Sequence, residues 1–193
     1  MFVDECCFTY RGVKQLGWSQ KGQNISIHRG SSLNNINCVA CVGAISEERG
    51  KEHFEFVERA FNSKQFLDFL KYLLIQKPEE KSLALILDNA SIHKTKSVKD
   101  WAIQHDVNII YNVPYAPWFN GIEEFWAEAK GVFRNMGTKA LLKTGSRDIW
   151  EEAHAATLAV VDEHAKKYAR RGLEAINSIQ LPHVEMASAG ILQ

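Results

Sequence analysis

The fold is decided by residues 82–133, which read SLALILDNASIHKTKSVKDWAIQHDVNIIYNVPYAPWFNGIEEFWAEAKGVF. Leu83 to Leu87 form an unbroken apolar run that ends on Asp88. A short apolar run bounded by polar residues is typical of a strand that is buried on both faces. Open α/β sheets bind their ligands beyond the carboxyl ends of such strands. We therefore expect the Asp88 carboxylate to lie at a binding site.

The rest of this stretch predicts a helix, a strand and a second helix. Residues 95–105 have helical periodicity, and residues 108–113 are rich in β-forming side chains and end before Pro114. The second helix is expected to open at Asn120, which stands three residues before Glu123 as in a capping box. Its apolar stripe consists of Ile122, Phe125, Trp126, Ala129 and Phe133.

This stripe distinguishes two neighbouring acids. At about 100° per residue, Glu123 lies at the edge of the stripe, whereas Glu124 points roughly the opposite way. A carboxylate at the edge of a buried face can reach a site on the sheet, and one on the far face cannot. We therefore predict Glu123 as a site residue, with the alternative that it only caps its helix.

A third acid stands in the first predicted strand, residues 2–8. Alternation places Asp4 on the same face as Phe2, Cys6 and Phe8. An acid on an otherwise apolar face needs a partner charge or a metal ion. Asp4 is therefore the third candidate.

The remaining elements are predicted from periodicity and from Gly and Pro. Strands are expected at residues 23–28, 36–45 and 53–57, and an amphipathic helix at residues 63–76. Residues 139–146 read as a basic loop, and residues 146–169 as one long helix that can be capped by Ser146. Strands and helices in this order predict a mixed α/β fold. A basic cluster is expected at the C-terminal end of the long helix, either matching the helix dipole or contacting DNA phosphate; it consists of Lys166, Lys167, Arg170 and Arg171.

Several motifs together resemble the catalytic half of a mariner-type DDE transposase, a DDE superfamily endonuclease that includes related bacterial insertion-sequence enzymes. The family has a DNAxxH block and a PYSPxxNPIExxW block, matched by LILDNASIHK at residues 85–94 and NVPYAPWFNGIEEFWAEAK at residues 112–130. It also has an N-terminal strand ending in Asp-Glu, matched by MFVDECCF, and a GWxxKG segment at residues 17–22. The resemblance covers roughly residues 1–135. Two departures are Gly121, where the family has Pro, and Trp118, where Asp is common.

The resemblance implies a ribonuclease-H-like fold, in which a mixed sheet is flanked by helices on both faces. We expect one such domain over residues 1–179 and a loose tail over residues 180–193. Transposases of this kind carry helix-turn-helix DNA-binding domains before the catalytic domain, and the chain is expected to lack them. The resemblance further implies binding to DNA, both transposon ends and target, and a homodimer in the active assembly.

The three acids are hard oxygen ligands that suit Mg²⁺ or Mn²⁺. Two such ions can activate an attacking oxygen and stabilise a leaving one. By resemblance, Asp4 bridges both ions, Asp88 completes the shell of one and Glu123 that of the other. The implied reactions are hydrolysis of a phosphodiester at a transposon end and then attack by the freed 3′-hydroxyl on target DNA. Because close acids repel, we also expect that neutralising Asp88 raises stability when no metal is bound.

Two other functions remain open. One is a different ribonuclease-H-like nuclease or integrase, against which the PYAPWFNGIEEFW block argues. The other is an inactive or domesticated remnant that acts as a DNA-binding or protein-binding module, against which the presence of all three acids argues.

Five further residues are candidate DNA contacts: Asn89, His93, Lys94, Trp118 and Lys130. Four of them have an alternative. Asn89 can orient the acid or its turn, and His93 can order the loop or cap the next helix. Trp118 can pack against the protein, and Lys130 can pair with an acid.

Charge and cysteine content indicate how the protein can bind DNA and in which compartment it is expected. The 23 basic and 23 acidic residues leave no formal net charge, which is a poor electrostatic footprint for a protein that holds DNA unaided. All four cysteines are predicted to be buried and free, which suits a reducing compartment. With a short acidic N-terminus and no apolar run near 18 residues, we expect neither secretion nor membrane insertion. The expected location is the cytoplasm or nucleoid of a bacterium, or the nucleus of a eukaryote.

Overall fold

The structure is a computed structural model, and it describes residues 1–9, 21–22, 38–76, 83–144 and 148–179. The predicted strand at residues 23–28 and the predicted tail at residues 180–193 lie outside these ranges.

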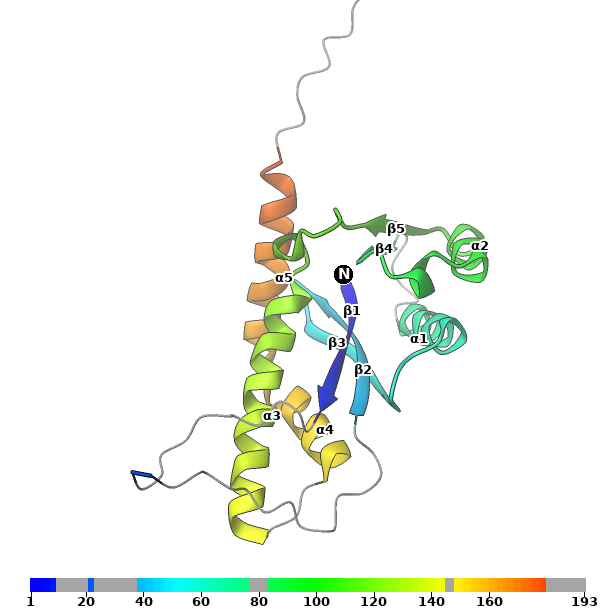
Figure 1. Cartoon of the computed structure of the whole chain (residues 1–193). Coiled ribbons are helices and arrows are strands. Elements are labelled where there is room, and N and C mark those ends of the chain that lie inside the picture. The colour runs from blue at the N-terminus through cyan, green and yellow to red at the C-terminus, as the bar shows by residue number, and fades with distance from the viewer. Residues whose placement is uncertain (10–20, 23–37, 77–82, 145–147, 180–193) are drawn as a thin grey trace, which may run out of the picture.

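The described strands form one mixed sheet in the order β3-β2-β1-β4-β5 (Figure 1). The central strand β1 (Phe2–Thr9) runs antiparallel to β2 (Cys38–Ser46) and parallel to β4 (Leu83–Leu87). β3 (Gly50–Glu58) pairs antiparallel with β2, and β5 (Val107–Tyr111) pairs parallel with β4. The predicted arrangement, an antiparallel meander that leads into parallel strands, is confirmed.

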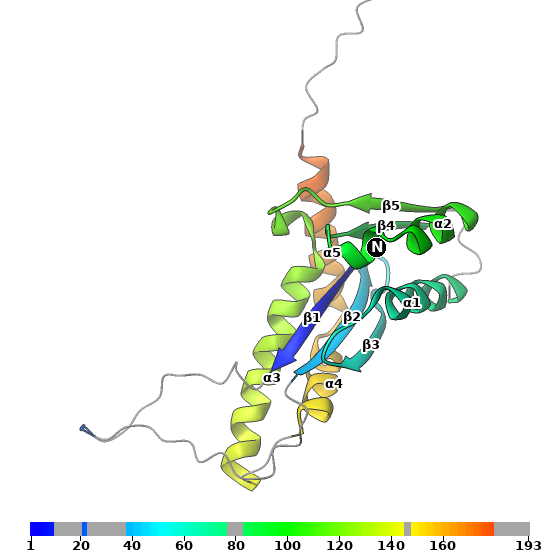
Figure 2. The ribbon, with the colours of Figure 1, turned by 45° about the vertical axis from the view of Figure 1, so that its right-hand side comes forward.

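Helices cover both faces of this sheet, as Figure 1 and Figure 2 show. α1 (Ser63–Ile75) and α2 (Lys96–Gln104) pack on one face, over a core that includes Val3 of β1. α3 (Ile122–Thr144), α4 (Ile149–Ala159) and α5 (Asp162–Asn177) cover the other face. The predicted stripe of α3 lies in this second core, together with Phe2, Cys6 and Phe8. Alternation along β1 thus places Asp4 on the α3 side of the sheet.

Two helix predictions are wrong. α3 continues through Thr144, so most of the predicted basic loop is helical, because Lys, Ala and Leu are good helix formers. The predicted long helix is two helices, with Val160 and Val161 in extended conformation between them. Lys51 stabilises this break, since its Nζ donates to the carbonyl oxygens of Leu158 at 3.0 Å and Val160 at 2.6 Å.

The helix ends also differ from the prediction. Asp148, and not Ser146, caps α4, because its side chain accepts from the backbone N–H groups of Trp150 and Glu151. Gly172 lies inside α5 and does not end it. Asn62 caps α1 and forms a capping box with Gln65.

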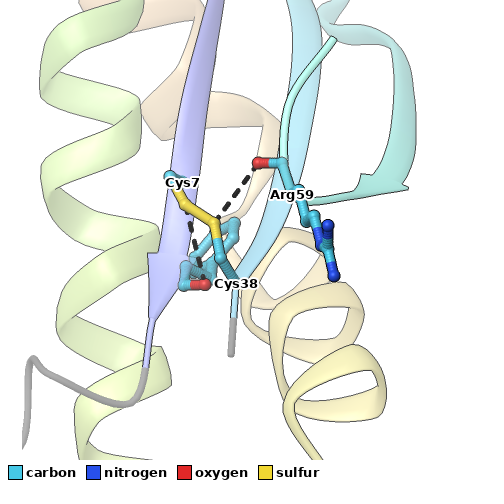
Figure 3. The surroundings of a disulfide bond; sticks show 4 residues. Cys7, Cys38 and Arg59 are labelled. Atoms are coloured by element: carbon cyan, nitrogen blue, oxygen red, sulfur yellow. Dashed lines mark hydrogen bonds between the residues drawn. A yellow bond between two sulfur atoms is a disulfide. The ribbon is translucent and has the colours of Figure 1, made fainter. Parts of the chain in front are cut away.

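The prediction of four free cysteines is wrong for two of them. Cys7 and Cys38 form a disulfide between neighbouring strands β1 and β2 (Figure 3). The Cys38 sulfur also lies 3.3 Å from the carbonyl oxygen of Arg59; this is a contact, because a bridged sulfur has no proton to donate. Cys6 and Cys41 are free and buried as predicted. Successive side chains of β1 point to opposite faces, so Cys6 reaches the α3 core, as Cys41 of β2 does, and Cys7 does not.

Two glycines let α5 cross directly behind the start of α3. A Cβ at Gly121 would lie 2.4 Å from the carbonyl oxygen of Tyr168, and one at Gly172 would lie 2.6 Å from the Phe2 ring and 2.8 Å from the backbone nitrogen of Gly121. The two backbones therefore touch where no side chain fits. Gly121, one of the two departures from the motif, thus has a structural reason in this chain.

We expect Gly172→Ala to lower the free energy of unfolding by about 1–3 kcal/mol, because the added methyl group overpacks this crossing. Chemical denaturation measures the change. Gly131→Ala in α3 is the matched control, since a Cβ there meets nothing closer than 4.0 Å. Helix propensity alone should make that control about 1 kcal/mol more stable. Equal stabilisation of both variants would contradict the close crossing.

Candidate active site

The predicted acids come from three elements that meet near one cleft. Asp88 directly follows β4, Glu123 lies in the first turn of α3, and Asp4 lies in β1. The cleft has a volume of about 470 Å³ and is lined by the ends of β4 and β5, the loop that follows β5 and the start of α3. Asp88, Asn120 and Glu123 belong to its lining. Asp4 lies beneath them, 6% exposed, and reaches the cleft wall through Asn120.

Asp4 is the most perturbed carboxylate of the three. Its Oδ1 accepts from the backbone N–H of Glu5 at 2.7 Å, and its Oδ2 accepts from Nδ2 of Asn120 at 3.0 Å. Burial raises the pKa of Asp4 to about 8, and the charges of Asp88, Glu5 and Glu123 add to the rise. The repulsion from Asp88 and Glu123 means that all three predicted acids act on the same small volume.

Asn120 supports Asp4 and does not cap α3 with its side chain. The predicted capping box is wrong: the backbone carbonyl of Asn120, at 3.1 Å, accepts from the Glu123 N–H. Its side-chain Nδ2 is turned to Asp4, because an amide nitrogen can donate to a carboxylate and an amide oxygen cannot. The Oδ1 atom is left buried and without a hydrogen-bond partner among the described residues.

Asp88 is held differently from Asp4. Its Oδ1 lies 2.8 Å from Nδ1 of His93 and accepts from the backbone N–H of Ala90 at 2.9 Å. The hydrogen bond from His93 holds the pKa of Asp88 below its ordinary value, although partial burial opposes this. Neutralising Asp88 therefore removes a stabilising contact, which reverses the prediction from charge repulsion. Asp4 is the acid to which that prediction applies.

Glu123 and Glu124 face different surroundings, as the helical geometry predicts. Glu123 lines the cleft. Glu124 forms an ion pair with Arg171 of α5 at 2.6 Å. A carboxylate that is occupied in this way is a matched control for its neighbour.

The predicted DNA contacts divide into buried and accessible side chains. His93 is fully buried, and the centroid of its ring lies 4.3 Å from that of Phe66. It therefore offers no surface to DNA, and the alternative that it orders the loop is favoured. Burial by itself lowers the pKa of His93, but hydrogen bonds to Asp88 and Glu5 outweigh it and raise the pKa to about 10. Lys130 is half-buried and close enough to lower the pKa of the Cys6 thiol, although burial raises that pKa more strongly.

Asn89, Lys94 and Trp118 remain accessible around the cleft. Asn89 lines it and donates to the carbonyl oxygen of Asn112. Lys94 donates to Asn89 at 2.5 Å and lies over the Tyr111 ring at 5.2 Å. Trp118 is 65% exposed and meets the Phe119 ring edge-on, with ring centroids 5.7 Å apart, so it packs against the protein only in part.

The basic cluster of α5 is largely occupied by acids. Lys166 pairs with Glu163, Arg170 with Glu47 and Arg171 with Glu124. Because α5 extends to Asn177, these residues lie in mid-helix. The prediction that they match a helix end is therefore wrong.

Three residues of the cleft region were not predicted. Glu5 contacts His93, Asn120 contacts Asp4, and Tyr115 lines the cleft while 98% exposed. Tyr115 also has a positive φ of 61°, which is uncommon for a residue other than Gly. Two of them lie in motifs that the sequence shows: Glu5 in the Asp-Glu pair of β1, and Tyr115 in the Pro-Tyr-Ala-Pro loop.

In the ranges that the structure describes, no three side chains of His, Cys, Asp or Glu lie close enough to hold a metal ion. The three acids therefore share an electrostatic environment and not a ready coordination shell. The donor chemistry nevertheless fits a hard cation, since Asp88 and Glu123 line the cleft, Asp4 lies beneath it, and the Asn120 amide oxygen has no hydrogen-bond partner among the described residues.

A family model described as DDE superfamily endonuclease matches residues 1–142. The chain belongs to this DDE endonuclease family. The match confirms the resemblance on which the prediction of a transposase-type domain depends.

Relatives of this DDE endonuclease chain agree with the assignment. An insertion element IS630 uncharacterized 39 kDa protein from Shigella sonnei is 29% identical over 107 residues, which are 54% of this chain and 27% of that protein. The Mos1 strand transfer complex has a TM-score of 0.63 at 16% identity and covers 91% of this chain and 52% of that one. The catalytic domain of Mos1 mariner transposase has a TM-score of 0.58 at 14% identity, and the match covers 92% of this chain and 80% of that one. These likenesses confirm the ribonuclease-H-like fold.

The chain thus spans about a quarter of the curated relative and about half of the transposase chain in the strand transfer complex. None of the described helices is both long and apolar enough to span a membrane.

We expect Asp4→Asn to stabilise the metal-free DDE domain progressively from pH 4 to pH 8. Below about pH 4, Asp4 is protonated in both the folded and the unfolded state. Between about pH 4 and pH 8 the unfolded chain releases this proton and the folded domain keeps it, so the wild type loses stability as the pH rises. Each pKa unit corresponds to about 1.4 kcal/mol, so the gain at pH 7 is a few kcal/mol. Thermal unfolding in EDTA at several pH values measures it.

Asp88→Asn is the control for this experiment. Its native pKa lies below the ordinary value, so its contribution is present above about pH 4 and the variant should be less stable at pH 7. Stabilisation of the same size in both variants would contradict the different environments of the two acids.

Proposed function

We propose that residues 1–179 form the catalytic domain of a DNA transposase. It hydrolyses a phosphodiester at a transposon end, and the freed 3′-hydroxyl then attacks target DNA, so that the strand is joined to the target. The proposal rests on one observation above all. A buried acid of the central strand carries a pKa raised to about 8, first by burial and then by repulsion from neighbouring acids that include Asp88 and Glu123. Such a convergence of carboxylates is costly without a cation.

Asp4, Asp88 and Glu123 would hold two Mg²⁺ or Mn²⁺ ions, with Asp4 shared between them. When bound, such ions activate the attacking oxygen and stabilise the leaving one. Solved structures of the Mos1 catalytic domain contain Mn and Mg, which supports this choice of metals. Glu123 is exposed, so its side chain has room to turn toward Asp4. Asp88 is held through Oδ1 by His93 and the Ala90 backbone, and its other oxygen is left for the cleft.

The other residues of the chain position these acids. Asn120 donates to Asp4 and keeps one of its oxygens in a fixed direction. Its free Oδ1 is suited to accept a hydrogen bond from a water molecule at the same place. In the hydrolysis step, water oxygen bonds to phosphorus while the 3′-oxygen leaves as a hydroxyl. In the transfer step, that hydroxyl attacks a target phosphodiester, which releases a new hydroxyl.

The substrate in this proposal is DNA, at transposon ends and at a target. The accessible residues that surround the cleft, Asn89, Lys94 and Trp118, are candidate contacts. The chain has no formal net charge, and the arginines of α5 are paired with acids. DNA affinity would therefore come mainly from further DNA-binding domains, within a homodimeric assembly.

We expect Mn²⁺-dependent nicking of supercoiled plasmid by the wild-type chain, and loss of that nicking in Asp88→Asn and Glu123→Gln. Each substitution removes one negative metal ligand and keeps the shape of the side chain. Conversion of supercoiled to open-circular DNA on an agarose gel measures the rate.

Glu124→Gln is the matched control, because it changes the adjacent acid, which pairs with Arg171 and lies away from the cleft. It should nick at nearly the wild-type rate. Equal rates for the wild type, Asp88→Asn and Glu123→Gln would reject the assignment of the active site.

A further inference from the structure

A buried histidine connects two carboxylates from different parts of the fold. Nε2 of His93 lies 3.0 and 3.1 Å from the two carboxylate oxygens of Glu5, and Nδ1 lies 2.8 Å from Oδ1 of Asp88. Glu5 and His93 are 88 residues apart in the chain. The histidine thus ties the middle of β1 to the end of β4.

The ring has no freedom to turn away from these two partners. Its side chain is 0% exposed and packs against the Phe66 ring of α1. The backbone of His93 is held as well, because its carbonyl oxygen accepts from the Tyr111 hydroxyl at 2.9 Å. Carboxylates only accept hydrogen bonds, so both contacts require that both ring nitrogens donate.

This bridge determines which oxygen of Asp88 is available. The close ion-pair contact of His93 Nδ1 and the hydrogen bond from the Ala90 backbone both fall on Oδ1, and Nδ1 also lies 3.4 Å from the Asp88 carbonyl oxygen. Within the described part of the chain, Oδ2 has no hydrogen-bond partner. The carboxylate is therefore fixed by one oxygen, and the other is left for the cleft that Asp88 lines.

We propose that Glu5 and His93 are positioning residues, which fix the orientation of Asp88 so that one of its oxygens is presented to the cleft. This inference rests on the proposed function of Asp88 as a metal-binding acid. Glu5 lies on the opposite face of β1 from Asp4. It acts on the same site through His93. Partners of this kind orient metal ligands in other proteins, and their loss costs about 10–100-fold in metal affinity.

Two substitutions of His93 separate its two contacts. In His93→Asn the amide nitrogen can take the place of Nδ1 and donate to Asp88, whereas in His93→Gln it can take the place of Nε2 and donate to Glu5. Both lose the ring and its packing against Phe66. If His93 positions Asp88, His93→Asn should bind Mn²⁺ about 10-fold more tightly than His93→Gln and nick plasmid faster, at similar melting temperatures. Electron paramagnetic resonance of free Mn²⁺ measures the affinity.

Glu5 offers a second test that tolerates substitution better, since its side chain is 19% exposed. Glu5→Gln can still accept a hydrogen bond from Nε2 and should keep most of the Mn²⁺ affinity. Glu5→Leu cannot, and should lose about 10-fold or more. Glu55→Leu is the matched control, because Glu55 also contacts a histidine, His53 at 3.1 Å on β3, and should leave Mn²⁺ affinity unchanged.

The outcomes distinguish this inference from the proposed function. A wild-type chain that neither binds Mn²⁺ nor nicks DNA overturns the proposed function. A wild type that does both, with equal Mn²⁺ affinity in His93→Asn and His93→Gln and in Glu5→Gln and Glu5→Leu, overturns the positioning role alone. If the His93 variants fail to fold, as circular dichroism would reveal, the Glu5 pair decides.

Discussion

The feature on which the rest of the site depends is a carboxylate buried in the central strand of the sheet. Asp4 lies on a face otherwise occupied by Phe2, Cys6 and Phe8, where an isolated charge is strongly unfavourable. The described structure offers it only two hydrogen bonds, from the Glu5 backbone and from Asn120. These do not balance burial and the neighbouring acids, which is why the pKa rises to about 8. Without a cation Asp4 therefore keeps its proton up to about pH 8, and a bound cation would favour the ionised form.

Asp88 shows how the same protein treats an acid that it does stabilise. Here a buried histidine supplies the hydrogen bond and lowers the pKa of the carboxyl group. Asp4 lies within β1 and Asp88 follows the neighbouring parallel strand β4, yet the protein holds Asp88 ionised and does not hold Asp4 ionised. This asymmetry fits a site in which one acid is oriented in advance and the other is shared by whatever cation arrives.

Much of this arrangement could be predicted from sequence because it depends on local periodicity. The apolar run that ends at Asp88, the alternation around Asp4 and the stripe beside Glu123 are all properties of short segments. The parts that failed depend on distant partners. Asn120 turns to Asp4, 116 residues away, and so does not cap its own helix. Lys51 reaches across 109 residues to the break between α4 and α5. No local pattern encodes the bridge from Cys7 to Cys38 or the glycine crossing of α3 and α5.

The charge of the cleft also bears on the order of binding under the proposed function. Without metal, Asp4 keeps its proton at neutral pH because its pKa is raised to about 8, but Asp88 and Glu123 remain at the cleft, and a DNA phosphate carries one further negative charge. In surroundings of reduced dielectric these charges repel more strongly than in water. Among the described residues, cations offset this only in part: His93 and Lys94 act on Asp88, whereas the arginines of α5 are paired with acids. Two divalent ions would bring four positive charges against three negative ones and reverse the sign of the cleft. Metal ions would therefore have to enter before, or together with, the scissile phosphate.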